Sequence, residues 1–333
     1  MQNKGGDIFL YIIWILDSKC NLNCSHCYVH SRGWERKISK ERGLKLIEEA
    51  KRADFKGIDF TGGEPLLIPE IFDYIKKAKE VGLEVSINSN ALLLNKDIVK
   101  FLKEYEVFVY ISVDGPNKES YEKIRGKNTF ENLVKNLELI KEESLEYSII
   151  FSISSLNYNF AKDMVSFAKD FSAKSLCMIP VIPAGEAKRT RVYIDSSLLI
   201  STIKEVKEEA ERLKYPVEVW CASFLKLFFD SPYLIIDECP IFDLLDISPS
   251  GDILICDVID NPLSEIRTKS LLSAINEVKN HPLYKLILER KENCTGCKIK
   301  DFCRGGCYAR ALIFYNDFSK KDPLCPKVLT PVG

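Results

Sequence analysis

Hydrophobic positions in the first half of the chain follow two alternating periods. Short, continuous apolar runs are typical of strands buried on both faces. They alternate with segments in which apolar residues recur every three or four positions, as in a helix that buries one face. The runs predict strands at residues 8–16, 57–60, 83–88, 107–113, 147–154 and 175–181. The helical periods lie at residues 38–53, 71–81, 97–105, 129–143 and 159–171, and a long charged helix is expected at 196–213.

Six strand–helix alternations predict a parallel α/β architecture with right-handed crossovers. Because eight such units would close a complete barrel, six predict an open, partial (β/α)6 TIM-like barrel. The distinctive polar clusters directly follow strands, which places them at the carboxyl ends of the strands, the catalytic face of such folds. Beyond residue 213 the pattern changes, because residues 217–238 lead into a cysteine-rich tail with shorter elements. We expect this tail to form a second, small α+β domain.

The composition fits a globular protein and argues against several classes of function. The chain has 333 residues, of which 46% are hydrophobic, enough for one large and one small domain. Lys and Arg number 47 and Asp and Glu 48, so the net charge of −1 gives no basic excess of the kind that binds nucleic acid. The prevalence of Lys and Glu among the charges resembles usage in thermophile proteins.

No apolar segment reaches the roughly 20 residues that a membrane-spanning helix needs. The run at residues 8–16 resembles the apolar part of a signal peptide. However, Asp7 precedes it, Asp17 and Lys19 follow it, and no small-residue cleavage site appears. A buried strand is the better interpretation, and we expect a cytoplasmic protein that does not bind membranes.

The 12 cysteines lie in short-spaced groups, which in a chain without a secretion signal indicates metal binding rather than disulfides. Cys20, Cys24 and Cys27 follow the first predicted strand in a C-x3-C-x2-C loop. Three thiolates can hold three irons of a four-iron cluster, which leaves one iron open to a small ligand. The alternative is a zinc site, which needs a fourth ligand, and His26 and His30 are the nearest candidates.

The segment from Thr61 to Pro65 follows the second predicted strand. Two glycines let a backbone approach a ligand closely, and a carboxylate accepts hydrogen bonds from an ammonium group. Together with the cysteine loop, this segment resembles the radical S-adenosylmethionine (SAM) superfamily. The resemblance implies that the three cysteines hold a [4Fe-4S] cluster, that SAM chelates its open iron through amino and carboxylate groups, and that Gly62, Gly63 and Glu64 bind the SAM amino group. The alternative is an ordinary glycine turn.

Three further stretches resemble the same family more loosely. Asn88 and Ser112 lie at the ends of the third and fourth predicted strands, and the resemblance implies that they lie near the SAM ribose or carboxylate. It also implies that Arg125 pairs with the SAM carboxylate, because a guanidinium suits bidentate carboxylate recognition. The alternatives are a surface arginine at Arg125 and a simple turn at Asp114.

The tail resembles the seven-cysteine SPASM domain of radical SAM enzymes, which include sulfatase, quinone-cofactor and peptide maturases and have relatives in haem biosynthesis. The spacing is Cys239-x11-Gly251-x4-Cys256, then Cys294-x2-Cys297-x5-Cys303-x3-Cys307, then Cys325. The resemblance implies two auxiliary [4Fe-4S] clusters. Cys294, Cys297, Cys303 and Cys325 would hold one cluster, and Cys239, Cys256 and Cys307 the other. A zinc ribbon is the alternative, but it would use only four of these cysteines.

Two four-iron clusters with complete cysteine ligation need about eight thiolates, one more than the motif supplies. Either one auxiliary iron is open or another residue completes the site, and Cys221 is the candidate. Cys177 lies inside a predicted strand and is expected to be a small core residue.

Asp257 directly follows Cys256, and the same Cys-Asp step in sulfatase maturases implies a general base that takes a proton from the substrate radical. The alternative is a solvated loop aspartate. The aromatic segment from Val219 to Tyr233 predicts either the wall of a substrate channel or a packed core helix.

The resemblance divides the chain into a radical SAM barrel at residues 8–190, a bridge at 191–235 and a SPASM domain at 236–328. It implies reductive cleavage of SAM to a 5′-deoxyadenosyl radical, with electrons from a ferredoxin or flavodoxin, and hydrogen abstraction from a peptide or protein side chain. An alternative substrate is a tetrapyrrole whose propionates are oxidised, as in alternative haem synthesis. A multi-cluster electron carrier is a non-enzymatic alternative, but a carrier has no use for a SAM-binding turn.

Overall fold

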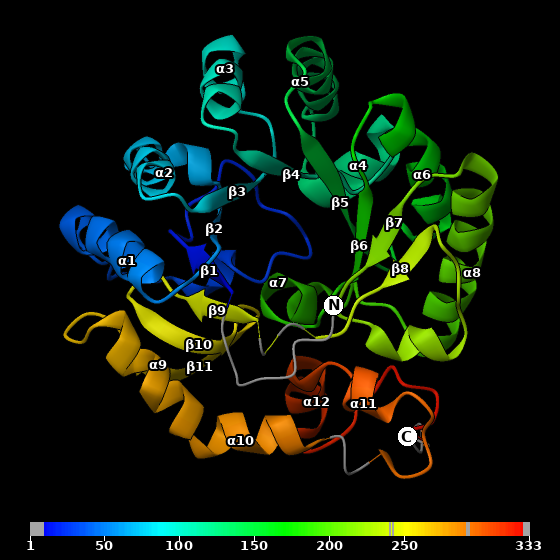
Figure 1. Cartoon of the computed structure of the whole chain (residues 1–333). Coiled ribbons are helices and arrows are strands. Elements are labelled where there is room, and N and C mark those ends of the chain that lie inside the picture. The colour runs from blue at the N-terminus through cyan, green and yellow to red at the C-terminus, as the bar shows by residue number, and fades with distance from the viewer. Residues whose placement is uncertain (1–9, 240, 242, 291–293, 329–333) are drawn as a thin grey trace.

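The computed structural model describes residues 10–239, 241, 243–290 and 294–328. Its strands form an eleven-stranded sheet in the order β11-β10-β9-β1-β2-β3-β4-β5-β6-β7-β8. Neighbours from β9 through β1 to β8 pair in parallel, whereas β10 and β11 are antiparallel. Figure 1 shows the strands curving around the middle of the molecule, with α1, α2, α3, α5, α6 and α8 outside them.

The strands are β1 (Tyr11–Ile15), β2 (Gly57–Thr61), β3 (Glu84–Ser89), β4 (Phe108–Ser112), β5 (Tyr147–Ile153), β6 (Leu176–Pro180), β7 (Val217–Val219), β8 (Leu234–Ile236), β9 (Leu244–Ile247), β10 (Asp252–Cys256) and β11 (Ile259–Glu265). The α-helices are α1 (Lys40–Arg52), α2 (Ile71–Glu80), α3 (Lys96–Glu104), α4 (Lys118–Arg125), α5 (Phe130–Glu143), α6 (Ala161–Asp170), α7 (Gly185–Thr190), α8 (Ser196–Leu213), α9 (Leu271–Asn280), α10 (Pro282–Glu289), α11 (Lys300–Cys303) and α12 (Tyr308–Tyr315). Short 3-10 helices are η1 (His30–Arg32), η2 (Pro65–Leu67), η3 (Tyr158–Phe160) and η4 (Ser223–Leu227). None of the described helices is long and apolar enough to cross a membrane.

The predicted α/β partial barrel is confirmed, and its six predicted strands are the consecutive neighbours β1 to β6. Local chemistry fixes the boundaries of several helices. The side chain of Ser39 accepts a hydrogen bond from Arg42 N at the start of α1, and Asn95 accepts hydrogen bonds from Asp97 N and Ile98 N at the start of α3.

The bridge contributes more to the barrel than its sequence indicated, because β7 and β8 continue the parallel sheet beyond β6. The core helix considered for the segment from Val219 to Tyr233 is absent from the described structure, which has only the short η4 there. Phe224 and Leu225 are fully buried, whereas Phe228 is 48% exposed. The apolar period in this segment therefore reflects a single 3-10 turn against the core.

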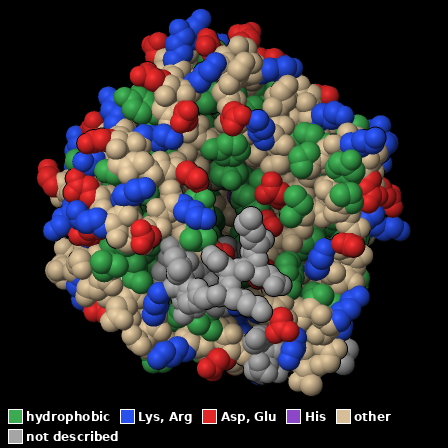
Figure 2. Space-filling model, viewed as in Figure 1, with side chains coloured by type: hydrophobic (Ala, Val, Ile, Leu, Met, Phe, Trp, Pro, Cys, Tyr) green, Lys and Arg blue, Asp and Glu red, His purple; other side chains and the backbone are tan. Residues whose placement is uncertain are grey.

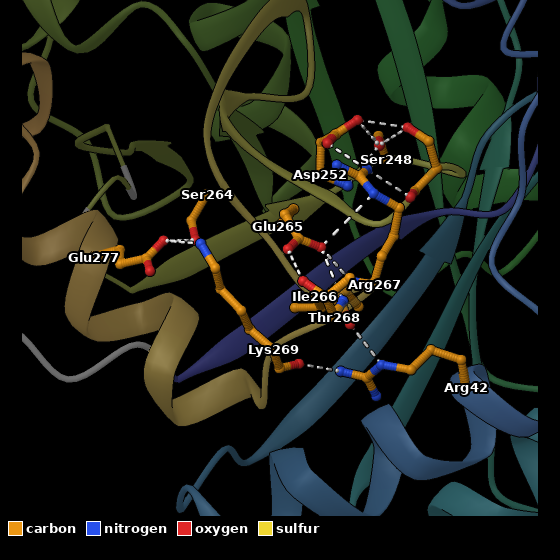
Figure 3. Close-up of polar contacts among 11 residues, drawn as sticks. Arg42, Ser248, Asp252, Ser264, Glu265, Ile266, Arg267, Thr268, Lys269 and Glu277 are labelled. Carbon is orange, nitrogen blue, oxygen red and sulfur yellow. Dashed lines mark hydrogen bonds and ion pairs between the residues drawn. The ribbon is translucent and has the colours of Figure 1, made fainter.

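The tail begins by extending the same sheet, since β9 pairs in parallel with β1. Figure 3 shows how the loop after β11 is tied to α1: Arg42 donates from Nε to Ile266 O at 2.6 Å and from Nη2 to Lys269 O at 3.2 Å. Arg267 also pairs with Asp252 at 2.5 Å. The division of the chain near residue 236 stays a prediction, and the strands on both sides of it belong to one sheet.

Candidate active site and cysteine groups

Cys20, Cys24 and Cys27 lie in the loop between β1 and η1, beyond the carboxyl end of β1. Backbone N–H groups point at two of the sulfurs: Leu22 N lies 3.4 Å from Cys20 Sγ, and His30 N lies 3.3 Å from Cys27 Sγ. Burial, and to a smaller extent the neighbouring Cys27 and Cys20 thiols, raises the pKa of Cys24 to about 12. Close sulfurs that receive N–H donors suit an iron–sulfur cluster, because metal binding takes the proton from each thiol and such hydrogen bonds stabilise the cluster's negative charge.

The Gly62-Gly63 turn after β2 packs directly on the start of this loop. Gly63 N donates to Asp17 O at 2.8 Å, and Glu64 N donates to Lys19 O at 2.9 Å. Gly62 has a φ of +139°, and a Cβ at either glycine would overlap the backbone of Asp17 or Lys19. The two glycines therefore hold the turn and the cysteine loop against each other.

The carboxylate of Glu64 is buried at 1% exposure and faces the end of β3. It accepts hydrogen bonds from Ser89 Oγ at 2.9 Å, from Asn90 N at 2.8 Å and from Leu66 N at 3.2 Å. Burial raises the pKa of Glu64 to about 7, although these hydrogen bonds lower it. A carboxylate offers about four lone-pair sites, so a positively charged ammonium group can still be received.

Asn90 connects Glu64 to the cysteine loop and was not singled out from the sequence. Its Nδ2 donates to Asn21 Oδ1 at 2.7 Å and lies 3.7 Å from Cys20 Sγ. Asn88, which the sequence did single out, instead donates to Asp59 at 2.5 Å on the inner face of the barrel. Ser112 ends β4, also on the inner face. The position of Asn90 could have identified it, because this residue lies just past the end of β3, where side chains contact neighbouring loops.

Arg125 ends α4 and is 7% exposed, so the surface-arginine alternative is wrong. Its Nε donates to Asp114 Oδ2 at 2.6 Å, and its Nη1 lies 4.0 Å from Cys24 Sγ. His26 Nε2 lies 2.6 Å from the same Asp114 oxygen, and Ser152 N donates to the other oxygen at 2.8 Å. Although burial raises the pKa of Asp114, the charges of Arg125 and His26 hold it well below its usual range.

These contacts test the alternatives considered for His26 and Asp114. His26 turns its Nε2 to Asp114, which disfavours the zinc site that would have used this histidine as a fourth ligand. Asp114 is fully buried and accepts four hydrogen bonds or ion pairs when its backbone contact to Asn157 is included, so it is more than a turn residue. It fixes a guanidinium beside the first cysteine loop.

Asp257 follows β10 and lies against the segment after Cys27. Tyr28 Oη donates to Asp257 Oδ2 at 2.5 Å, and Arg32 donates to Asp257 O at 2.5 Å. Cys256 Sγ lies 3.5 Å from Asp257 Oδ1. These partners tie Asp257 to neighbouring residues, although it lies in the turn between β10 and β11 and is partly exposed, so its role as a base stays a prediction. Asp257 lies between the first cysteine loop and a tail cysteine.

The first tail group consists of Cys221, Cys239, Cys256 and Cys307. Burial raises the pKa of Cys221 well above its ordinary value, with further increases from Cys307 and Cys239. Burial likewise raises the pKa of Cys256, to which Asp257, Asp246 and Cys307 contribute. The four thiols therefore share one region, in which each of these cysteines is partly buried. They come from the segment after β7, from the segment before β9, from β10 and from the start of α12.

The second tail group consists of Cys294, Cys297, Cys303 and Cys325. Burial raises the pKa of Cys303 to about 11, with smaller increases from Cys325 and Cys294. Burial also raises the pKa of Cys325, with contributions from Cys294 and Cys297. Four close thiols fit a four-iron cluster with complete ligation. Cys177 lies apart from both groups, fully buried in β6 with Ser175 Oγ at 3.8 Å, as expected of a core residue.

A buried ion pair that sequence reasoning missed lies against the first tail group. Arg310 and Asp322 are 1% and 0% exposed and are bonded through two contacts of 3.0 and 2.8 Å. Asp322 also accepts a hydrogen bond from Cys307 N at 2.9 Å, and Arg310 donates to Cys221 O. A Cβ at Gly306 would meet the Asp322 side chain at 2.5 Å, which explains the glycine.

Comparisons with known proteins agree with this geometry. The model of the radical SAM superfamily matches residues 14–168. The chain is 27% identical to the Fe-coproporphyrin III synthase of Methanosarcina barkeri, over 97% of this chain and 89% of that relative. It is 26% identical to the cysteine-type anaerobic sulfatase-maturating enzyme of Clostridium perfringens, over 87% of this chain and 86% of that relative. The fold resembles that of native anSMEcpe with bound AdoMet, with a TM-score of 0.75 and 19% identity over 95% of this chain and 94% of that chain.

Proposed function

We propose that this chain is a radical SAM enzyme that uses SAM to take a hydrogen atom from a carbon of its substrate, because the superfamily model matches residues 14–168 and the chain is similar to a sulfatase-maturating enzyme. The observation that carries the proposal is the meeting of three cysteine sulfurs, the Glu64 carboxylate and the Arg125 guanidinium in one place. When bound, the cluster supplies one electron to SAM, whose cleavage gives methionine and a 5′-deoxyadenosyl radical.

Residues in and around the first cysteine loop would bind different parts of the cluster and of SAM. Cys20, Cys24 and Cys27 would ligate three irons. Glu64 would receive the SAM ammonium, while Arg125, held by Asp114, would pair with the SAM carboxylate. Gly62 and Gly63 hold the turn, and Asn88 and Ser112 line the adjoining inner face of the barrel.

The tail cysteines would hold two auxiliary clusters that accept the electron left on the substrate after hydrogen abstraction. Cys294, Cys297, Cys303 and Cys325 would ligate one cluster, and Cys239, Cys256, Cys307 and Cys221 the other. Asp257 would accept the proton that leaves the substrate at the same time, since Tyr28 and Arg32 hold it between the two centres. A small reductant such as ferredoxin or flavodoxin would supply the first electron.

The leading substrate class is a peptide or protein side chain. It is favoured by the similarity to the sulfatase-maturating enzyme. The second candidate is a tetrapyrrole, favoured by the similarity to Fe-coproporphyrin III synthase, which extends over nearly the whole of both chains.

The test of the proposed function is product formation. The protein, reconstituted anaerobically with iron and sulfide and reduced with dithionite, is expected to convert SAM to 5′-deoxyadenosine, measured by chromatography. An electron carrier would bind iron and accept electrons but would form no 5′-deoxyadenosine. That outcome would remove the enzymatic proposal.

Replacing Asp114 with Asn is expected to weaken SAM binding by about tenfold or more, because a charge-assisted hydrogen bond to Arg125 contributes about 1.5–3 kcal/mol. The measurement is a SAM titration followed by the electron paramagnetic resonance (EPR) signal of the reduced first cluster. Arg125→Lys is a second variant, since it keeps the charge but loses the planar fork.

Iron content and the unfolding temperature serve as controls for Asp114→Asn, because an unpaired buried arginine also destabilises the fold. Glu142→Gln, on the exposed side of α5, should behave like the unaltered protein. Unchanged SAM affinity in a folded, iron-loaded Asp114→Asn protein would contradict the positioning role.

A further inference from the structure

The inner face of the barrel sheet is a partly open surface. Trp14 and Phe60 stack against Tyr74 of α2, with ring centroids 4.8 and 6.2 Å apart, so their side of the sheet is the outer, helix-covered side. Residues that alternate with them, such as Ile13 and Asp59, point inward and are partly exposed, whereas Trp14 and Phe60 are at most 2% exposed. Figure 2 shows a hollow near the middle of the viewed face of the molecule, bordered by hydrophobic, acidic and basic side chains.

One side of this inner face carries two carboxylates in the same register. Asp246 of β9 and Asp59 of β2 both pair with Ile13 of β1. Asp59 accepts hydrogen bonds from Ser86 Oγ and Asn88 Nδ2, each at 2.5 Å. Burial raises the pKa of Asp59 to about 7, yet solvent partly reaches the residue, as expected at the wall of a narrow hollow.

Asp246 has an unused acceptor. The residue is 9% exposed, and its Oδ2 accepts a hydrogen bond from Asp257 N at 2.8 Å. Its Oδ1 is buried and has no hydrogen-bond partner in the part of the chain that the structure describes. Leaving a buried carboxylate oxygen without a donor is costly, so this oxygen indicates a nearby positive or donor group. Asp246, Cys256 and Asp257 each offer a ligand atom within 4.8 Å of the others, which places this carboxyl group where the inner face meets the first tail group.

The other side of the inner face combines a carboxylate with aromatic rings. Glu218 of β7 lies in register with Cys177 of β6 and accepts a hydrogen bond from Trp220 Nε1 at 3.3 Å. The Trp220 ring packs edge-on against Tyr110 of β4 with centroids 5.6 Å apart. Burial and then Glu218 raise the pKa of Asp237, just past β8, to about 6. Tyr110 connects the two sides, because Asp59 and Glu218 both raise its pKa in addition to burial.

Cations are missing from this surface. Among the inward-facing positions of the described strands β1 to β9 there is no Lys, Arg or His, whereas Asp59, Glu84, Glu218 and Asp246 are acidic. Arg32 belongs to η1, beyond the strands. Its positive charge lowers the pKa of Asp246, and it donates a hydrogen bond to Asp257 O. The wall therefore presents carboxyl groups and aromatic faces to whatever enters. Because burial raises the pKa of Asp59 to about 7 and the pKa of Asp246 well above its usual range, a cation that enters favours the charged form of these carboxyl groups.

We infer that this inner wall, formed by Asp59, Glu218 and Asp246 with Tyr110 and Trp220, binds a positively charged group of the substrate, the side chain of a Lys or Arg in a peptide. Carboxylates pair with such a group, and aromatic rings attract it when it is desolvated. A tetrapyrrole with several carboxylates meets repulsion at the same wall. This inference rests on the proposed function, since it names the substrate class of that site.

Binding of short probe peptides tests the inference. Three acetylated, amidated peptides that differ only in a central Lys, norleucine or Glu are titrated by calorimetry into the reconstituted protein with SAM, and iron coproporphyrin III is titrated as a polyanionic probe. The Lys peptide is expected to bind about tenfold tighter than the norleucine peptide and to weaken with salt. The Glu peptide and the porphyrin are expected to bind more weakly than either.

Single substitutions test whether the preference for the Lys peptide comes from the inner wall. Asp59→Asn and Glu218→Gln each remove a charge without changing shape, and each is expected to lower the preference for Lys severalfold. Glu142→Gln on the exposed side of α5 should keep it. Iron content checks that both variants fold, and Glu218→Gln alone suffices if Asp59→Asn loads poorly.

The outcomes separate this inference from the proposed function. If 5′-deoxyadenosine forms without added peptide but the Lys peptide shows no preference, or none of the peptides binds, the cationic substrate class is wrong while the proposed function stands. Tighter binding of the porphyrin than of the Lys peptide overturns the inference in favour of the tetrapyrrole. If no 5′-deoxyadenosine forms at all, the proposed function fails first.

Discussion

Cys24→Ala is expected to abolish 5′-deoxyadenosine formation while both tail clusters stay bound. Cys24 is the buried cysteine of the first loop, and the Arg125 guanidinium lies beside its sulfur. With two thiolates left, the loop cannot hold a four-iron cluster with one open iron, and without that cluster SAM is not reduced. The measurements are chromatographic detection of 5′-deoxyadenosine and the iron content per chain.

The iron count makes this result specific. Three four-iron clusters would give about twelve irons per chain, and the variant should keep about eight. Cys177→Ala is the matched control, because Cys177 is buried in β6 away from all three groups. It should keep about twelve irons and full activity. A Cys24→Ala protein that still forms 5′-deoxyadenosine above background would show that the first loop is not the reaction centre.

Cys221→Ala is expected to degrade one auxiliary cluster. Cys221 has a φ of +57°, a left-handed conformation that is uncommon for residues other than glycine, and its carbonyl accepts a hydrogen bond from the buried Arg310. This backbone turns the thiol into the region shared with Cys239 and Cys307. With three thiolates left, the site is expected to lose iron or to convert to a three-iron cluster.

The change is measured by Mössbauer and EPR spectroscopy of the reconstituted variant, with Cys177→Ala as control. Formation of 5′-deoxyadenosine without substrate should persist, since the first cysteine loop is untouched. Three intact four-iron clusters in Cys221→Ala would mean that this cysteine is no ligand and that one auxiliary iron is open to another group. The experiment therefore distinguishes an auxiliary cluster completed by Cys221 from one that has an open iron.

The buried Arg310–Asp322 ion pair gives a physical reason why this part of the tail is held in place. Asp322 receives Cys307 N, Arg310 reaches Cys221 O, and both side chains are almost fully buried. Removal of one partner would leave an uncompensated buried charge, which typically costs about 3–5 kcal/mol. The pair therefore holds Cys221 and Cys307 of the first tail group in place.

Local features of this protein were determined by its sequence. The strand and helix periods gave β1 to β6 and the helices between them except α4, because burial of an apolar face has a short repeat along the chain. The spacing of Cys20, Cys24 and Cys27 also fixed a metal-binding loop, since all three lie within one turn-rich segment.

The tertiary structure alone decided which distant residues meet. Register and crossovers brought β9 beside β1, buried Arg125 against Asp114, turned His26 away from the cysteines and joined Cys221 to Cys307. It also placed Asp59, Glu218 and Asp246 on one inner face, although they lie in three separate parts of the chain. No local pattern encodes such meetings, because they depend on how the sheet aligns strands that are far apart in sequence.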